Sequence, residues 1–135
     1  MNAIAKRILV VDDDVPLCEC LNLVLSRAGY DVVSVGDGVA ALGEWHRRPF
    51  DLVITDLIMP EKEGLATIME LRKLAPRLKI IAISGGGRIA PGDYLNLARH
   101  LGANAALAKP FSSEAMLSTV AQLLVEATAP AAPIS

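Results

Sequence analysis

The chain has 135 residues, of which 53% are hydrophobic and 21% charged, and its net charge is -2 at pH 7. This length allows one buried core and is too short for two ordinary domains. No run of Lys or Arg is dense enough to follow a phosphate backbone, which argues against direct nucleic-acid binding. The apolar run Ile8–Val11 is far shorter than a signal-peptide core or a membrane span. A cytoplasmic protein with no membrane attachment is therefore expected.

The first predicted elements are a short strand and a long amphipathic helix. The run Ile8–Val11 is typical of a buried strand. The helix after it is expected to begin near Asp14, whose carboxylate can cap the first turn, and to end at Gly29. Cys18 and Cys20 lie two residues apart in this helix and therefore point to different sides. They are interpreted as ordinary thiols with no shared metal or disulfide.

The same alternation continues along the rest of the chain. The further expected strands are Val32–Val35, Leu52–Thr55, Ile80–Ser84 and Ala105–Ala108. The helices between them are expected to end before Pro49, Pro76 and Gly102, and a fifth helix follows a capping Ser112. The strand runs are apolar on both faces, as in strands that helices cover on both sides. The predicted fold class is therefore α/β, a doubly wound five-stranded parallel sheet.

The C-terminal end differs in composition from the rest of the chain. Residues 128–135 contain two prolines and three alanines and show no helical period. Residues 1–127 are therefore expected to form the single domain, and residues 128–135 a disordered tail.

Polar residues with chemical potential stand where four of the five predicted strands end. Asp12 and Asp13 follow the first strand, Asp56 follows the third, Ser84 ends the fourth and Lys109 follows the fifth. In this fold class the carboxyl ends of the strands meet at one edge, where ligands bind. Converging carboxylates repel one another unless a cation lies among them, and Mg²⁺ is the natural candidate because it typically binds one or two carboxylates together with phosphate oxygens. The pattern predicts a magnesium site at this edge.

These residue types together suit phosphoryl transfer to a carboxylate. The Asp56 carboxylate can attack a phosphoryl group, provided that cations neutralise the charge on the phosphoryl oxygens. Lys109 supplies one such cation, and the Ser84 hydroxyl can donate a hydrogen bond to a phosphate oxygen. Taken singly, each residue is more often a cap, a turn residue or a solvated side chain. Their combination at successive strand ends favours the phosphoryl-accepting site.

Four segments, ILVVDDD, DLVITDLIMPEKEG, IIAISGGG and LAKPF, resemble the motifs of receiver domains of bacterial two-component response regulators, of the chemotaxis-regulator-like single-domain type. The resemblance implies a flavodoxin-like sheet of strand order 2-1-3-4-5 over residues 1–127. It implies that Asp56 takes the phosphoryl group from a histidine kinase or a histidine phosphotransfer protein, and that Ser84 and Lys109 contact the phosphate. The implied Mg²⁺ ligands are Asp12, Asp13, Asp56 and the backbone carbonyl of Leu57.

The resemblance also has consequences for signalling. The domain would catalyse only its own phosphorylation and dephosphorylation, so it is a signalling protein and not an enzyme with a separate substrate. A downstream target protein would read the signal through the face of the fourth helix, the fifth strand and the fifth helix, which can also form a dimer. Many receivers carry an aromatic residue three positions before the motif lysine, where this chain has Ala106.

Three alternatives remain open from the sequence. The pair Asp12 and Asp14 resembles the nucleophile pair of haloacid-dehalogenase-like phosphatases, although that interpretation leaves Asp56 without a role. The chain can also be a receiver-fold interaction module that takes no phosphate, or the receiver part of a longer regulator with a DNA-binding output.

Overall fold

The computed structural model of the chain describes residues 5–57, 63–84, 96, 100 and 102–128. It contains a five-stranded parallel sheet of order β2-β1-β3-β4-β5, which confirms the predicted fold class and strand order. The elements are β1 Arg7–Val11, α1 Val15–Arg27, β2 Asp31–Val35, α2 Gly38–Arg47, β3 Leu52–Asp56, α3 Glu63–Leu74, β4 Lys79–Ser84, β5 Ala105–Ala108 and α5 Ser113–Thr128. The predicted fourth helix lies outside the described residues except for Asn96 and His100, which are both helical.

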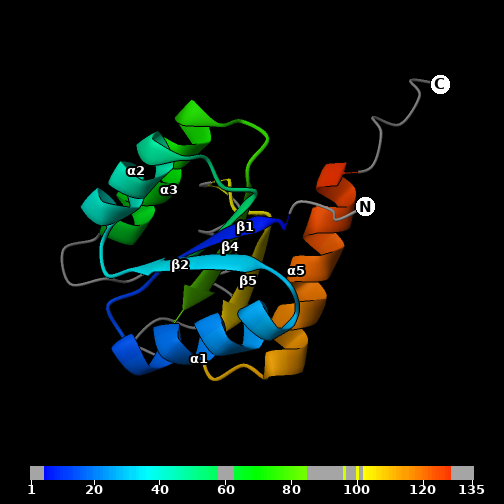
Figure 1. The fold of residues 1–135 in the computed structure, drawn as a ribbon. Helices are drawn as coiled ribbons and strands as arrows, with labels where there is room; N and C mark the ends of the chain where they lie inside the picture. The colour runs from blue at the N-terminus through cyan, green and yellow to red at the C-terminus, as the bar shows by residue number, and fades with distance from the viewer. Residues whose placement is uncertain (1–4, 58–62, 85–95, 97–99, 101, 129–135) are drawn as a thin grey trace.

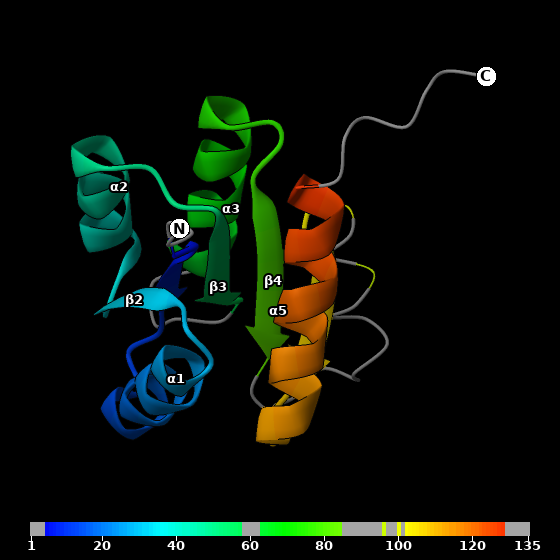
Figure 2. The same ribbon diagram turned by 45° about the vertical axis from the view of Figure 1, so that its right-hand side comes forward.

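Helices cover both faces of the sheet, with α1 and α5 on one side and α2 and α3 on the other (Figures 1 and 2). Successive strand residues point to opposite faces, so β1 sends Ile8 and Val10 toward α1 and α5, and Leu9 and Val11 toward α2 and α3. This double coverage explains why β1, β3 and β4 are apolar at almost every position. Within the described part of the chain, no helix has both the length and the apolar character needed to cross a membrane.

Three strands begin one residue earlier than predicted, each with a charged side chain. These first residues are Arg7, Asp31 and Lys79. They lie at the amino ends of the strands, at the edge of the sheet, where a charged side chain can reach solvent. The Arg7 guanidinium pairs with Asp31 at 2.9 Å and lies 4.5 Å from the centre of the Phe50 ring. A prediction based on apolar runs misses such residues because it stops at the first charge.

The helix caps confirm the predicted starts of α1 and α5. The Asp14 carboxylate accepts a hydrogen bond from the backbone N–H of Leu17 at 3.2 Å. The Ser112 hydroxyl oxygen accepts from the backbone N–H of Ala115 at 3.0 Å. Beyond the C-terminus of α1, Gly29 has a φ of 99°, a left-handed conformation that favours glycine. The caps therefore fix where α1 begins beside the carboxyl edge of the sheet.

Arg72 on α3 joins three segments at the opposite edge. Its guanidinium donates hydrogen bonds to the carbonyl oxygens of Ala75, Pro76, Leu78 and Gly102 and to the side-chain oxygen of Asn104. The shortest of these bonds, to Gly102, measures 2.6 Å. The same Asn104 oxygen accepts from the backbone N–H of Ile80 at 2.9 Å. Arg72 therefore ties the end of α3 to the starts of β4 and β5.

We expect Arg72→Met to lower the free energy of unfolding by roughly 2–3 kcal/mol, because it leaves several carbonyl oxygens without their charged donor. The change is measured by urea denaturation. Lys73→Met is the matched control, since Lys73 is exposed on the same helix, and we expect a change within about 0.5 kcal/mol. Equal effects of the two substitutions would contradict a joining role for Arg72.

Candidate functional site

The structure brings the predicted site residues to one edge of the sheet. Asp12 follows β1, Asp56 ends β3, Ser84 ends β4 and Lys109 follows β5. One carboxylate oxygen each of Asp12, Asp13 and Asp56 lies within 4.8 Å of the others. Asp12, Asp56 and Ser84 are buried, whereas Asp13 is exposed. The site is therefore an acidic group that is mostly buried and reaches solvent at Asp13.

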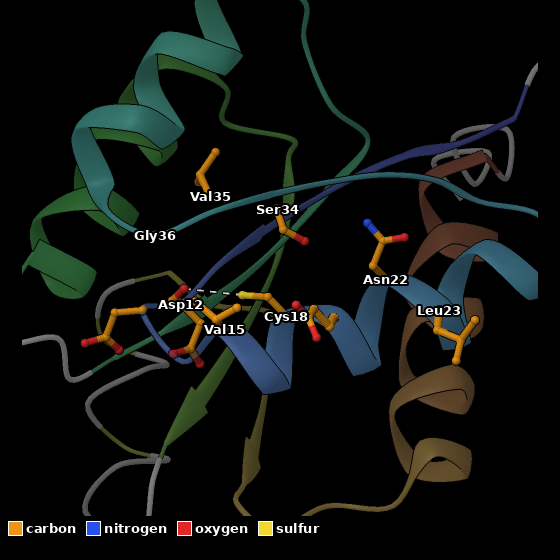
Figure 3. Close-up of a pocket in the computed structure, with 10 residues that line it drawn as sticks. Asp12, Val15, Cys18, Asn22, Leu23, Ser34, Val35 and Gly36 are labelled. Atoms are coloured by element: carbon orange, nitrogen blue, oxygen red, sulfur yellow. Dashed lines mark hydrogen bonds between the residues drawn. The ribbon is translucent and has the colours of Figure 1, made fainter.

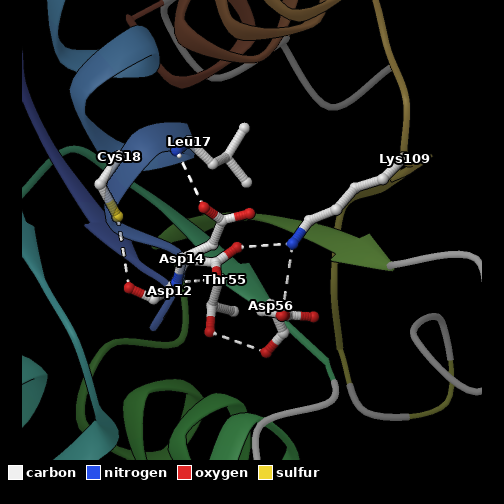
Figure 4. Close-up of polar contacts among 7 residues, drawn as sticks. All are labelled: Asp12, Asp14, Leu17, Cys18, Thr55, Asp56 and Lys109. Atoms are coloured by element: carbon white, nitrogen blue, oxygen red, sulfur yellow. Dashed lines mark hydrogen bonds and ion pairs between the residues drawn. The ribbon is translucent and has the colours of Figure 1, made fainter.

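Lys109 is the cation of this group (Figure 4). Its Nζ lies 2.8 Å from Oδ2 of Asp12 and 3.5 Å from Oδ2 of Asp56. The Asp12 side chain is 0% exposed, and that of Lys109 is 21% exposed. Burial alone would lower the pKa of Lys109, but the hydrogen bond to Asp12 and the charges of Asp56 and Asp12 outweigh it and raise that pKa. Lys109 is therefore held in its charged form between the two carboxylates.

Backbone hydrogen bonds beyond the strand ends hold the site in position. The Lys109 N–H donates to the carbonyl oxygen of Ser84 at 2.7 Å, which extends the pairing of β4 and β5. The Leu57 N–H donates to the carbonyl oxygen of Ile83 at 2.9 Å, and the Leu57 side chain is buried. The residues that follow β3 and β5 are both fixed to β4 as a result.

Asp12 is held by partners that the sequence did not reveal. Its Oδ1 accepts from the backbone N–H of Asp14 at 2.9 Å, so each of its carboxylate oxygens has a donor. The Cys18 thiol donates to the Asp12 carbonyl oxygen at 3.3 Å. Burial, followed by the charges of Asp12 and Asp14, raises the pKa of Cys18 to about 11. The thiol is therefore a neutral neighbour of the acidic group.

Thr55 is a second neighbour that sequence reasoning missed. It is fully buried, and its hydroxyl donates to the carbonyl oxygen of Asp56 at 3.2 Å (Figure 4). The available signal was a hydroxyl side chain directly before Asp56 in an otherwise apolar run. Thr55 thus braces the backbone that carries the candidate acceptor.

The chemistry of the ligand set fits a hard divalent cation. Asp12, Asp13 and Asp56 offer carboxylate oxygens, and the Lys109 ammonium is paired with Asp12 and Asp56. One positive charge against three negative ones leaves an excess of negative charge in a largely buried place. A divalent ion with a preference for oxygen ligands, such as Mg²⁺, offsets that excess.

Comparison with known proteins agrees with this geometry. The family model of the response regulator receiver domain matches residues 8–121. The chain is also 30% identical over 122 residues to the response regulator receiver protein CpdR of Brucella abortus, covering 90% of this chain and 99% of CpdR. The chain belongs to the response regulator receiver domain family. Receiver domains are phosphoacceptor signalling domains that bind Mg²⁺ at an acidic pocket and interact with histidine kinases and downstream effectors.

Two further comparisons place this receiver domain among its relatives. The CheY-like receiver domain protein of Methanospirillum hungatei superimposes with a TM-score of 0.83 at 27% identity, covering 92% of this chain and 97% of that one. The DNA-binding transcriptional regulator NtrC of Bradyrhizobium is 35% identical over 125 residues, which are 90% of this chain and 25% of NtrC. The chain thus spans nearly all of CpdR and a quarter of NtrC. Family membership decides in favour of the receiver over the haloacid-dehalogenase-like phosphatase.

The two cysteines are expected to differ strongly in reactivity. A rise in pKa from 9.0 to about 11 lowers the Cys18 thiolate fraction about a hundredfold near neutral pH. We expect iodoacetamide to modify exposed Cys20 first and Cys18 at least about a hundredfold more slowly, as followed by peptide mass spectrometry. In urea the two rates should converge. Equal rates in the folded protein would contradict the burial of Cys18.

Lys109→Met is expected to lower the free energy of unfolding at neutral pH by roughly 3 kcal/mol, because it leaves the buried Asp12 carboxylate without its cation. The raised pKa of Lys109 means that the ion pair is complete below the ordinary lysine pKa and is lost only as pH rises through the raised value. Urea denaturation at neutral pH measures the change. Lys73→Met serves as the control, and a similar small change in the free energy of unfolding of both variants would contradict the prediction.

Proposed function

We propose that this chain accepts a phosphoryl group on Asp56 from a histidine kinase or a histidine phosphotransfer protein, in a Mg²⁺-dependent reaction, and signals to a separate target protein through a conformational switch. The observation that carries the proposal is the Asp56 carboxylate itself. It is buried at the end of β3, 3.5 Å from the Lys109 ammonium and within one acidic group with Asp12 and Asp13.

The reaction needs a nucleophile, charge compensation and a hydrogen-bond donor. An Asp56 carboxylate oxygen attacks phosphorus, the bond from phosphorus to the donor's imidazole nitrogen breaks, and the imidazole keeps the electron pair. Lys109 offsets negative charge on the phosphoryl oxygens from a fixed position. The Ser84 hydroxyl donates to a phosphoryl oxygen once the group has arrived.

The acidic group would hold the metal. Its proposed ligands are Asp12, Asp13, Asp56 and the backbone carbonyl of Leu57. Bound Mg²⁺ supplies charge neutralisation at the phosphoryl oxygens. Asp12 is fixed by the Asp14 N–H and by Lys109, so the protein prepares this part of the site before the metal binds.

The remaining parts of the proposal concern the domain and its partners. Residues 1–127 form the receiver domain and residues 128–135 a tail, in a cytoplasmic protein. The target, or a second copy of the chain, binds the face that includes β5 and α5 together with the fourth helix.

Incubation with acetyl phosphate and Mg²⁺, followed by intact mass measurement, tests the acceptor. We expect the mass gain of one phosphoryl group in the parent, none in Asp56→Asn and none when EDTA removes the metal. Asp37→Asn is the matched control, because Asp37 caps α2 and asparagine caps a helix equally well. It should gain the same mass as the parent.

Two outcomes would contradict the proposal in different ways. A mass gain in Asp56→Asn would place the phosphate on another residue. No gain in the parent would favour the interaction module that takes no phosphate.

A further inference from the structure

A cavity of about 460 Å³ lies between α1 and the carboxyl end of β2, beside the acidic edge (Figure 3). Its volume is in the range of small-molecule sites in proteins. Val15 and Leu23 line it and are 62% and 53% exposed, so apolar side chains meet solvent at its opening. Neither residue belongs to the phosphoryl-accepting group described above.

Small polar side chains explain why this space stays open. Tyr30, just before β2, and Val32 within β2 pack against the core beneath α1 and α5, and the two-residue alternation directs Ser34 to the same side. In Figure 3 the Ser34 side chain points from β2 toward α1, where Cys18 and Asn22 lie. A serine opposite a cysteine leaves space that larger apolar residues would fill.

Ser34 also has an unmet hydrogen bond. Its hydroxyl oxygen is buried and has no hydrogen-bond partner among the described residues. A buried hydroxyl without a partner is costly. The unmet bond indicates that β2 and α1 do not pack closely around Ser34, in line with the open space beside it.

The charge of the lining indicates the sign of a ligand that would fit the cavity. Asp12, Asp13 and Glu19 line the cavity, and none of its described lining residues is basic. Asp12 is already paired with Lys109, but Asp13 and Glu19 are exposed at the opening. A cation is the complementary group for this end of the cavity.

We propose that the cavity binds a small organic amine with an apolar body. The apolar body lies against Val15 and Leu23, and the ammonium group lies near Asp13 and Glu19. Because Asp13 is also a proposed metal ligand, the amine competes with Mg²⁺. This competition rests on the proposed function, whereas the binding does not.

Amide chemical-shift mapping of the full chain in metal-free buffer tests the binding. Phenylpropylamine is the probe, and phenylpropanol, which has a similar shape without the charge, is its neutral counterpart. We expect shifts centred on Cys18, Asn22, Ser34 and Gly36, and roughly fivefold tighter binding of the amine. Shifts centred elsewhere, or equal affinities for the two probes, would overturn the proposal.

Two pairs of variants separate the shape of the cavity from its charge. Ser34→Leu fills the space and should weaken amine binding by at least about tenfold, whereas Ser118→Leu on the exposed side of α5 should leave it unchanged. Glu19→Gln should reduce the preference for the amine over the alcohol, and Glu114→Gln should not. Unchanged amine affinity in Ser34→Leu, together with an unchanged preference for the amine in Glu19→Gln, would refute the site.

Phosphorylation by acetyl phosphate tests the competition separately. Saturating amine should raise the Mg²⁺ concentration needed for half-maximal phosphorylation of the parent, and should have no effect on Ser34→Leu, which retains the phosphoryl-accepting group. Mapped binding without this shift would overturn the competition and leave the binding standing. Failure of phosphorylation in the absence of amine would count only against the proposed function.

Discussion

The ion pairs of Lys109 with Asp12 and Asp56 join residues at the carboxyl ends of three different strands. Asp12 and Lys109 are 97 positions apart in the chain, yet their charged atoms lie 2.8 Å apart. A completely buried carboxylate needs such a cation, because burial of an unpaired charge is costly. The carboxyl edge of the sheet can therefore be acidic and still be stable, as the proposed phosphoryl-accepting site requires.

The same balance prepares the edge for added charge. One ammonium does not neutralise three carboxylates, so the group favours a further cation. A phosphoryl group in turn would bring new negative charge, which Lys109 and a metal held by the acidic group would offset. Two buried neighbours add no charge to the group: the pKa of Cys18 is raised by burial, and the Thr55 hydroxyl donates to the backbone.

The sequence predicts the acidic edge well because its signals are local. Asp56 and Lys109 each stand directly at a strand end, and the parallel sheet brings all such ends together. Other features depend on neighbours distant in the chain and had no local signal. Arg72 looks like any helical arginine until Gly102 and Asn104 lie beside it. Likewise, the cavity is formed by residues of two different elements, among them Cys18 on α1 and Ser34 on β2.

The residues in and directly after β5 bear on how the proposed signal could leave Asp56. Ala106 is partly buried and packs against the core beneath α2 and α3, so this position offers no aromatic ring that could rotate. A direct mechanical link does exist between the N–H of Lys109 and the carbonyl oxygen of Ser84, at 2.7 Å. Both residues are proposed to contact the phosphate, and they end neighbouring strands. A phosphate that contacts both side chains would therefore be coupled to the backbone of β4 and β5 together, which gives the proposed switch a path that needs no aromatic ring.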